Sequence, residues 1–173
     1  MFIKSTTYFG DVKVEIHSEQ TFEKCYANFW AVYNHQRILV SIFEYNLMGN
    51  KLLSCWDIVN TYPEINKIAK KAIIKNFSIK NSEVNKFFKY YFDKYSVNEQ
   101  LIKEIFGVND SEKIDIKTLV EQLSYPDLDF NFEDDIWTFC VDYGFLEPYF
   151  DDDLRFEVSF NEKKEVINFE TYQ

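Results

Sequence analysis

The stretch WTFCVDYGFLEPYFDDDLRFEVSFNEKKEVINFETY, residues 137–172, decides the fold of this 173-residue chain. Apolar and polar side chains alternate along Trp137–Phe145 and again along Leu154–Phe160, which is typical of strands with one buried face. A turn at Asn161–Lys164 leads to a last strand at Val166–Thr171, and connections this short favour antiparallel pairing. The stretch therefore predicts the end of an antiparallel sheet with one aromatic face and one polar face.

Strand patterns also fill the first part of the chain, residues 1–48. In residues 11–17, DVKVEIH, valine and isoleucine alternate with charged side chains, which is typical of a half-buried strand. Residues 25–45 predict two further strands around a tight turn. The first of these carries apolar side chains on both faces, Trp30 and Val32 among them. This favours either a central strand covered on both sides or a strand packed under helices.

Start and stop signals divide residues 52–123 into helices. Pro63 suits the opening of a helix because its missing N–H needs no partner there, and Ser82 suits an N-cap. Ser96 and Glu99 have the spacing of a capping box, so we expect a helix to begin after Ser96. The remaining signals predict a short helix at Leu52–Asn60, a left-handed helix end at Gly107, and a helix at Ile116–Leu123 capped by Asp115.

These patterns together predict an α+β fold in a single domain that spans residues 1–173. It has N-terminal strands (1–48), a central helical segment (52–123) and a C-terminal antiparallel meander (127–171) packed on the helices. A chain of this length buries a sufficient core without disulfides or structural metals. The aromatic face of the meander must lie against the helices, and the polar face must meet water or a partner. The sequence leaves open whether the strands form one continuous sheet or two.

The net charge of −10 is confined to the last part of the chain. Residues 1–124 hold 15 acidic and 16 basic residues, whereas residues 125–173 hold 14 acidic and 3 basic ones. A field of this sign repels nucleic acids and anionic lipid surfaces, and it attracts a basic protein. We therefore expect a basic protein as the partner, and neither a nucleic acid nor a membrane. The alternative is that the acids only keep the protein soluble.

No segment of the sequence predicts export or a membrane span. The start lacks a basic region followed by an apolar block, and nowhere do about 18 apolar residues follow one another. Cys25, Cys55 and Cys140 are an odd number without C-x-x-C spacing, which favours reduced and buried thiols. We therefore expect a cytoplasmic protein.

No motif predicts a cofactor, and no residue stands out as catalytic. Walker, G-x-G-x-x-G and G-x-S-x-G patterns are absent, and the two histidines lack metal-site spacing. Polar residues at alternate positions, as in a calcium loop, are Asp127, Asp129, Asn131 and Glu133. However, Phe132 stands where such a loop needs glycine. We expect no metal and no cofactor. The sequence leaves open whether the protein is an enzyme, and the missing motifs favour a protein that is not.

The C-terminal run resembles the closing hairpin of a bacterial family called domain of unknown function 2004. The matching positions are Asp142-Tyr143, Pro148, Asp151 to Asp153 and Phe160, with Tyr8-Phe9-Gly10-Asp11 similar to the opening of that family. The ending Glu170-Thr171 departs from the acidic-serine ending of the family. The resemblance implies a bacterial cytosolic α+β protein of unassigned activity and carries over no catalytic residues. Small acidic proteins of this kind are often immunity proteins encoded beside toxins.

The favoured hypothesis is an acidic protein-binding module of the immunity type that neutralises a basic toxin. Exposed aromatic side chains beside charges are where binding energy concentrates. The predicted partner-binding residues are two aromatic anchors and seven acids, namely Tyr149, Phe150, Asp129, Glu133, Asp134, Asp135, Asp151, Asp152 and Asp153. The last three aspartates also suit the turn between two strands.

Two alternatives stay open. A small-molecule-binding protein or an enzyme would use a pocket between the sheet and the helices. In that case a buried Asp142 would need Arg37 or Arg155 as its partner. A purely structural homodimer would use the acidic turns only as devices for solubility.

Overall fold

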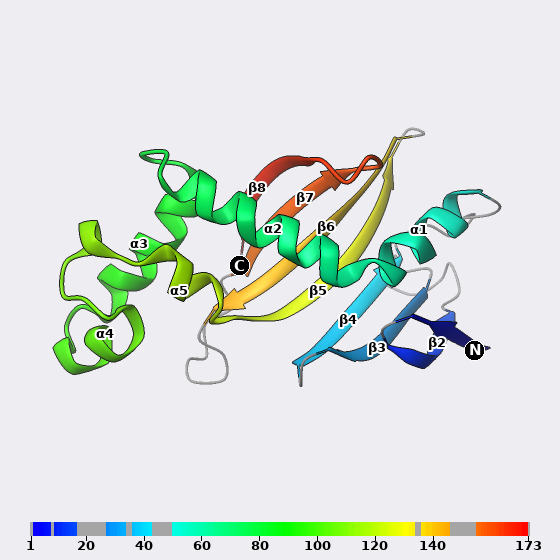
Figure 1. Cartoon of the computed structure of the whole chain (residues 1–173), viewed down its shortest axis with the longest axis horizontal. Helices are drawn as coiled ribbons and strands as arrows, with labels where there is room; N and C mark the ends of the chain where they lie inside the picture. Colours follow the sequence, from blue (N-terminus) through cyan, green and yellow to red (C-terminus); the bar gives the residue numbers. More distant parts are fainter. Residues whose placement is uncertain are drawn as a thin grey trace.

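The computed structural model describes residues 2–7, 9–16, 27–33, 36–42, 50–133, 136–145 and 155–172. Strands of these residues form one eight-stranded sheet in chain order (Figure 1). The strands are β1 (Phe2–Thr6), β2 (Gly10–Ile16), β3 (Ala27–Tyr33), β4 (Gln36–Ile42), β5 (Leu123–Glu133), β6 (Ile136–Phe145), β7 (Arg155–Asn161) and β8 (Val166–Tyr172). The predicted α+β fold is confirmed, with N-terminal strands, central helices and a C-terminal sheet of mostly antiparallel strands.

One parallel pair joins the two groups of strands. Val40 of β4 lies opposite Leu128 of β5, and Ile42 lies opposite Phe130. All other neighbouring strands pair antiparallel. A parallel pair needs a long crossover, and the helical segment between β4 and β5 supplies it. The N-terminal strands and the C-terminal meander therefore form one continuous sheet.

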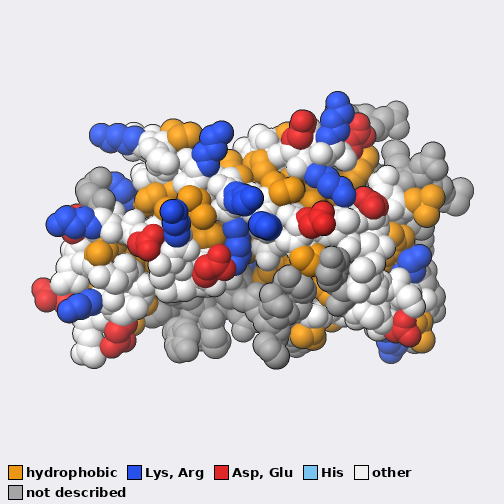
Figure 2. Space-filling model, in the orientation of Figure 1, with side chains coloured by type: hydrophobic (Ala, Val, Ile, Leu, Met, Phe, Trp, Pro, Cys, Tyr) orange, Lys and Arg blue, Asp and Glu red, His pale blue; other side chains and the backbone are white. Residues whose placement is uncertain are grey.

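The described helices cover one face of this sheet. They are α1 (Asn50–Asn60), α2 (Tyr62–Phe77), α3 (Glu83–Tyr95), α4 (Glu99–Phe106), the 3₁₀ turn η1 (Ser111–Lys113) and α5 (Ile116–Val120). Figure 1 shows α2 in front of the sheet and crossing its strands, with α3, α4 and α5 at one end. Figure 2 shows the same side, where lysine and arginine side chains gather in the region of α2. Lys67, Lys71 and Lys75 are exposed residues of that helix.

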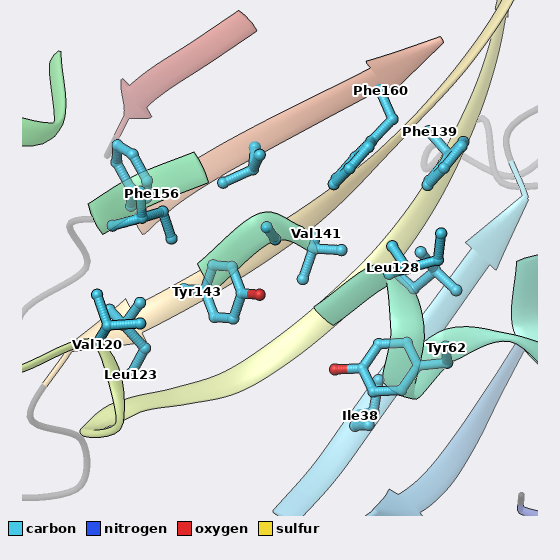
Figure 3. Packing of buried hydrophobic residues seen from close by; sticks show 14 of the residues in the cluster. Ile38, Tyr62, Val120, Leu123, Leu128, Phe139, Val141, Tyr143, Phe156 and Phe160 are labelled. Atoms are coloured by element: carbon cyan, nitrogen blue, oxygen red, sulfur yellow. The ribbon is translucent and has the colours of Figure 1, made fainter. Parts of the chain in front are cut away.

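Rings from the helices and the strands fill the space between them. Phe87 of α3 is 1% exposed, and its ring centroid lies 5.0 Å from that of Phe156 and 6.1 Å from that of Phe145. Figure 3 shows how side chains of β4 to β7 pack with Tyr62 of α2 and with Val120 of α5. The aromatic face of the meander lies against the helices, as the alternation in the sequence predicts.

Two predicted helix signals are confirmed in atomic detail. The Ser82 hydroxyl accepts a hydrogen bond from the backbone N–H of Asn85 at 3.1 Å, so Ser82 is the N-cap of α3. Gly107 ends α4 in the left-handed conformation with φ of 71°, and its N–H donates to the carbonyl of Lys103. Glycine adopts this conformation without the steric cost that a Cβ atom brings.

The predicted capping box at Ser96 and Glu99 is wrong. Asn98 is the N-cap of α4, and its side-chain oxygen accepts from the N–H of Leu101 at 3.1 Å. Ser96 instead ends α3, where its hydroxyl donates to the carbonyl of Asp93 at 2.7 Å. Because α3 and α4 follow each other closely, the serine hydroxyl is used at the end of the first helix.

The prediction that β3 is covered on both sides is also wrong. Phe29 is 2% exposed and stacks on Trp56 of α1, with 5.6 Å between the ring centroids. Trp30 and Val32 point to the other face and are 54% and 63% exposed. The alternative of a strand packed under helices is the one observed. The helix predicted at Ile116–Leu123 is also too long, because α5 ends at Val120 and β5 begins at Leu123.

Candidate functional site

The face of the sheet opposite the described helices, hereafter the open face, carries the acids of the C-terminal strands. Leu128, Val141 and Val158 are fully buried in the core beneath the helices. Since successive side chains of a strand point to opposite faces, their sequence neighbours belong to the open face. The acids placed there are Asp127 and Asp129 of β5, Asp142 of β6, Glu157 of β7 and Glu170 of β8.

Four of these acids stand directly opposite one another on four neighbouring strands. Asp127 pairs with Asp142, Asp142 pairs with Glu157, and Glu157 pairs with Glu170. We call Asp127, Asp142, Glu157 and Glu170 the acid ladder. Neighbouring strands lie about 4.8 Å apart, and like charges in directly opposed positions destabilise a sheet. The repulsion between the acids of the ladder therefore lowers the stability of the sheet.

Arg155 compensates part of this charge. Its Nη2 donates to Oδ2 of Asp127 at 3.1 Å and its Nε donates to Oδ2 of Asp142 at 3.2 Å. The Tyr172 hydroxyl donates a short hydrogen bond to the same Oδ2 of Asp142. Arg155 is thus observed as a partner of Asp142, as one of the two predicted arginine partners, and the side chain of Arg37 lies outside the described residues.

The other oxygen of Asp142 has no hydrogen-bond partner among the described residues. Asp142 is 5% exposed, and its Oδ1 is buried. Burial raises the pKa of this carboxyl, while the Arg155 guanidinium and the Tyr172 hydroxyl oppose that rise. Burial also raises the pKa of the Tyr172 phenol, and so does its hydrogen bond to Asp142. Buried polar atoms are nearly always satisfied, so the lone Oδ1 marks this position as unusual.

Asp129 lies two residues after Asp127 on β5, on the same face, and stands opposite Ser41 and Cys140. Burial raises the pKa of Asp129 to about 7, a hydrogen bond with Ser41 lowers it, and the charges of Asp127, Asp142 and Glu157 raise it. Burial also raises the pKa of the neighbouring Cys140 thiol. The charge of Asp129 therefore changes close to neutral pH.

Replacing Asp129 by asparagine should stabilise the protein more at high pH than at low pH. The folded chain holds the Asp129 proton more tightly than the unfolded chain, because the folded pKa is raised to about 7. The residue therefore lowers the free energy of unfolding as pH rises from about 4 to about 7. Relative to the parent, the free energy of unfolding of Asp129→Asn should rise by about 3–4 kcal/mol between pH 4 and pH 8.

Urea unfolding at these two pH values measures the difference. Glu162→Gln, which removes one exposed acid in the turn before β8, is the matched control and should leave the pH dependence unchanged. An Asp129→Asn variant with the same pH profile as the parent would contradict the assignment of this titration to Asp129.

The row that holds the ladder continues into apolar side chains. Leu39 precedes Val40, the partner of Leu128, and the N–H of Leu39 donates to Oδ1 of Asp127 at 2.9 Å. Trp30 of β3 lies opposite Leu39 and is 54% exposed. A single row thus crosses the open face from Trp30 through Leu39 to the four acids of the ladder. It combines a large aromatic side chain with negative charge.

Most of the predicted partner-binding residues lie outside the described residues. These are Asp134, Asp135, Tyr149, Phe150, Asp151, Asp152 and Asp153. Asp129 is described and lies on the open face. Glu133 ends β5 opposite Ile136, and its side chain is not described. The ladder itself was missed: its acids alternate with core residues in each strand, but no sequence signal fixes which acids stand opposite one another.

Open hollows lie on the helix side of the sheet in the described part of the chain. One of about 280 Å³ lies between α2 and β8 and is lined by Ala72, Lys75, Asn76, Ile79, Val166 and Phe169. Asp142 is buried, as the pocket hypothesis requires, but it lies on the opposite face from the helices. No described residues form a cluster of acids, cysteines and histidines able to hold a metal ion. None of the described helices is long and apolar enough to cross a bilayer.

Comparison with protein-family models, with curated proteins and with solved structures finds no match for this chain. The resemblance to domain of unknown function 2004 therefore stays a prediction. The functional argument rests on the geometry of the open face.

Proposed function

We propose that the protein is an acidic protein-binding module of the immunity type, acting in a bacterial cytoplasm, which neutralises a basic toxin by binding it on the open face. One observation carries this proposal: the ladder of Asp127, Asp142, Glu157 and Glu170 in directly opposed positions. Arg155 makes its ion pairs with the first two of these acids. The other two add negative charge that a cationic partner would compensate.

The physical reason for this function is the cost of the ladder in the free protein. Repulsion between like charges on neighbouring strands is relieved when cations approach them. A basic partner is also steered toward a surface of opposite charge, which raises the association rate. The exposed Trp30 in the same row provides the kind of aromatic side chain that often carries binding energy at interfaces.

A binding measurement with the purified product of the adjacent gene tests this function. We expect a complex in low salt that weakens strongly in high salt, because screening acts on exposed charges. The double variant Glu157→Gln and Glu170→Gln should bind about tenfold more weakly, since each exposed ion pair contributes up to about 1 kcal/mol. Glutamine keeps an acceptor oxygen for the Ser159 hydroxyl, which donates to Glu157 at 2.5 Å.

The matched control is the double variant Glu64→Gln and Glu162→Gln, which removes the same charge from exposed positions outside the open face. It should bind like the parent. A complex that is absent at every salt concentration, or a control variant that loses as much affinity as the ladder variant, would overturn the proposal.

A further inference from the structure

We propose that the open face binds a basic α-helix of the partner protein, which lies across the strands with its cationic side chains over the acid ladder and an apolar side chain against Trp30. This inference rests on the proposed function and states which element of the partner is bound. It follows from the spacing of the ladder, the length and polarity of its row, and an unsatisfied oxygen within it.

The spacing of the ladder matches a helix better than an extended segment. Neighbouring strands place successive acids about 4.8 Å apart, so four of them span about 14 Å. On a helix, residues at i, i+3, i+7 and i+10 lie on one side and rise by about 4.5, 10.5 and 15 Å. Side chains on one face of an extended segment repeat about every 6.7 Å, so only three cations would fit the same span.

The row extends beyond the acids and sets the length and polarity of the bound helix. From Trp30 on β3 to Glu170 on β8 the row crosses six strands, or about 24 Å, which is the length of a helix of about 16 residues. The β3 end presents Trp30 and Leu39, and the β8 end presents Glu170, an exposed acid. A complementary helix is therefore apolar toward one end and cationic along the rest.

Helix α2 shows that this sheet accommodates a helix across its strands. Figure 1 shows α2 in front of the sheet and crossing strands that include β5 and β6, on the face opposite the acid ladder. A second helix on the open face would give the sheet helices on both faces, which is a common layered arrangement in proteins.

The unsatisfied oxygen lies within the ladder. Oδ1 of Asp142 is buried without a hydrogen-bond partner among the described residues, whereas Oδ2 already accepts from Arg155 and Tyr172. An approaching ammonium or guanidinium group would add positive charge beside these carboxylates. Since Asp142 is 5% exposed, Glu157 and Glu170 on the neighbouring strands are the more accessible contacts for that group.

Two synthetic peptides of about 16 residues and identical composition test the inference. In the first, four lysines stand at i, i+3, i+7 and i+10 and a leucine and a phenylalanine lie near one end of the same helical face. In the second, the lysines stand at i, i+2, i+4 and i+6, which places them on one face of an extended strand. Calorimetric titration of the whole protein in low salt should show the first peptide binding about tenfold more tightly. Circular dichroism should show that it gains helix on binding.

Variants of the protein then distinguish the binding of a helix from the binding of a basic partner in general. Binding of the first peptide should weaken about tenfold in Glu157→Gln with Glu170→Gln, and should be unchanged in the control Glu64→Gln with Glu162→Gln. Trp30→Ala should weaken the first peptide more than the second. If both peptides bind equally and both lose affinity in the ladder variant, the basic partner stands but the helix is wrong. If neither peptide binds, or the control variant loses as much as the ladder variant, both the helix and the proposed function are overturned.

Discussion

Replacing Phe87 by alanine is expected to lower the free energy of unfolding by about 3–5 kcal/mol. Phe87 is 1% exposed and stands at the junction of α3 with the sheet, where its ring contacts Phe145 of β6 and Phe156 of β7. Its loss leaves a cavity that these strands cannot close, because their positions are held by the ladders of hydrogen bonds on either side. Urea unfolding followed by circular dichroism measures the difference.

Tyr90 on the same helix provides the matched control. Its ring is of similar size but is 41% exposed, so Tyr90→Ala removes little buried area. We expect it to lower the free energy of unfolding by less than about 1 kcal/mol. Equal losses in the two variants would mean that α3 does not pack on the sheet in the way the ring contacts of Phe87 require.

Replacing Arg155 by methionine is expected to lower the free energy of unfolding by about 3–5 kcal/mol at neutral pH, which is the second large effect. The substitution keeps an apolar side chain of similar length but removes the cation that bridges Asp127 and Asp142. Asp142 then stays buried without a cation beside it, and the Tyr172 hydroxyl and the backbone N–H of Tyr143 are the donors that remain to its carboxyl. Burial already raises the pKa of Asp142, and without the guanidinium this pKa rises further.

The sign of the pH dependence distinguishes this cause from a simple loss of packing. A carboxyl whose folded pKa is raised destabilises the protein above its unfolded pKa, and the loss shrinks as pH falls and the group takes up a proton. The defect of Arg155→Met should therefore be smaller at pH 4 than at pH 8. Adding Asp142→Asn should restore part of the stability, as a double-mutant cycle would measure. A defect that is the same at both pH values and is not relieved by Asp142→Asn would refute the bridging role.

The acids of the C-terminal strands are less exposed to solvent than the distribution of charge in the sequence alone indicates. The sequence predicts that they gather on one side of the sheet, and the described acids of β5 to β8 do so. Asp142, however, is almost fully buried, and Asp129 has a pKa raised to about 7 by burial.

The order of elements followed from the sequence because its causes are local. Alternation identified the two faces of β2 and of β5 to β7. Ser82, Gly107 and Asp115 marked ends of helices where a side chain or a left-handed residue satisfies nearby backbone groups. The error at Ser96 arose where two helices follow each other and a single hydroxyl has two possible uses. The error at β3 arose because apolar residues on both faces do not say how many layers cover a strand.

The candidate site depended on relations that no local pattern contains. The sequence by itself determined which residues of each C-terminal strand point to the core and that the rest carry negative charge, since strand periodicity needs only adjacent residues. The tertiary structure alone decided that β4 pairs parallel with β5 and that Asp127, Asp142, Glu157 and Glu170 stand in one row. The physical reason is that register is set between segments far apart in the chain, by the turns and the shared core that align them.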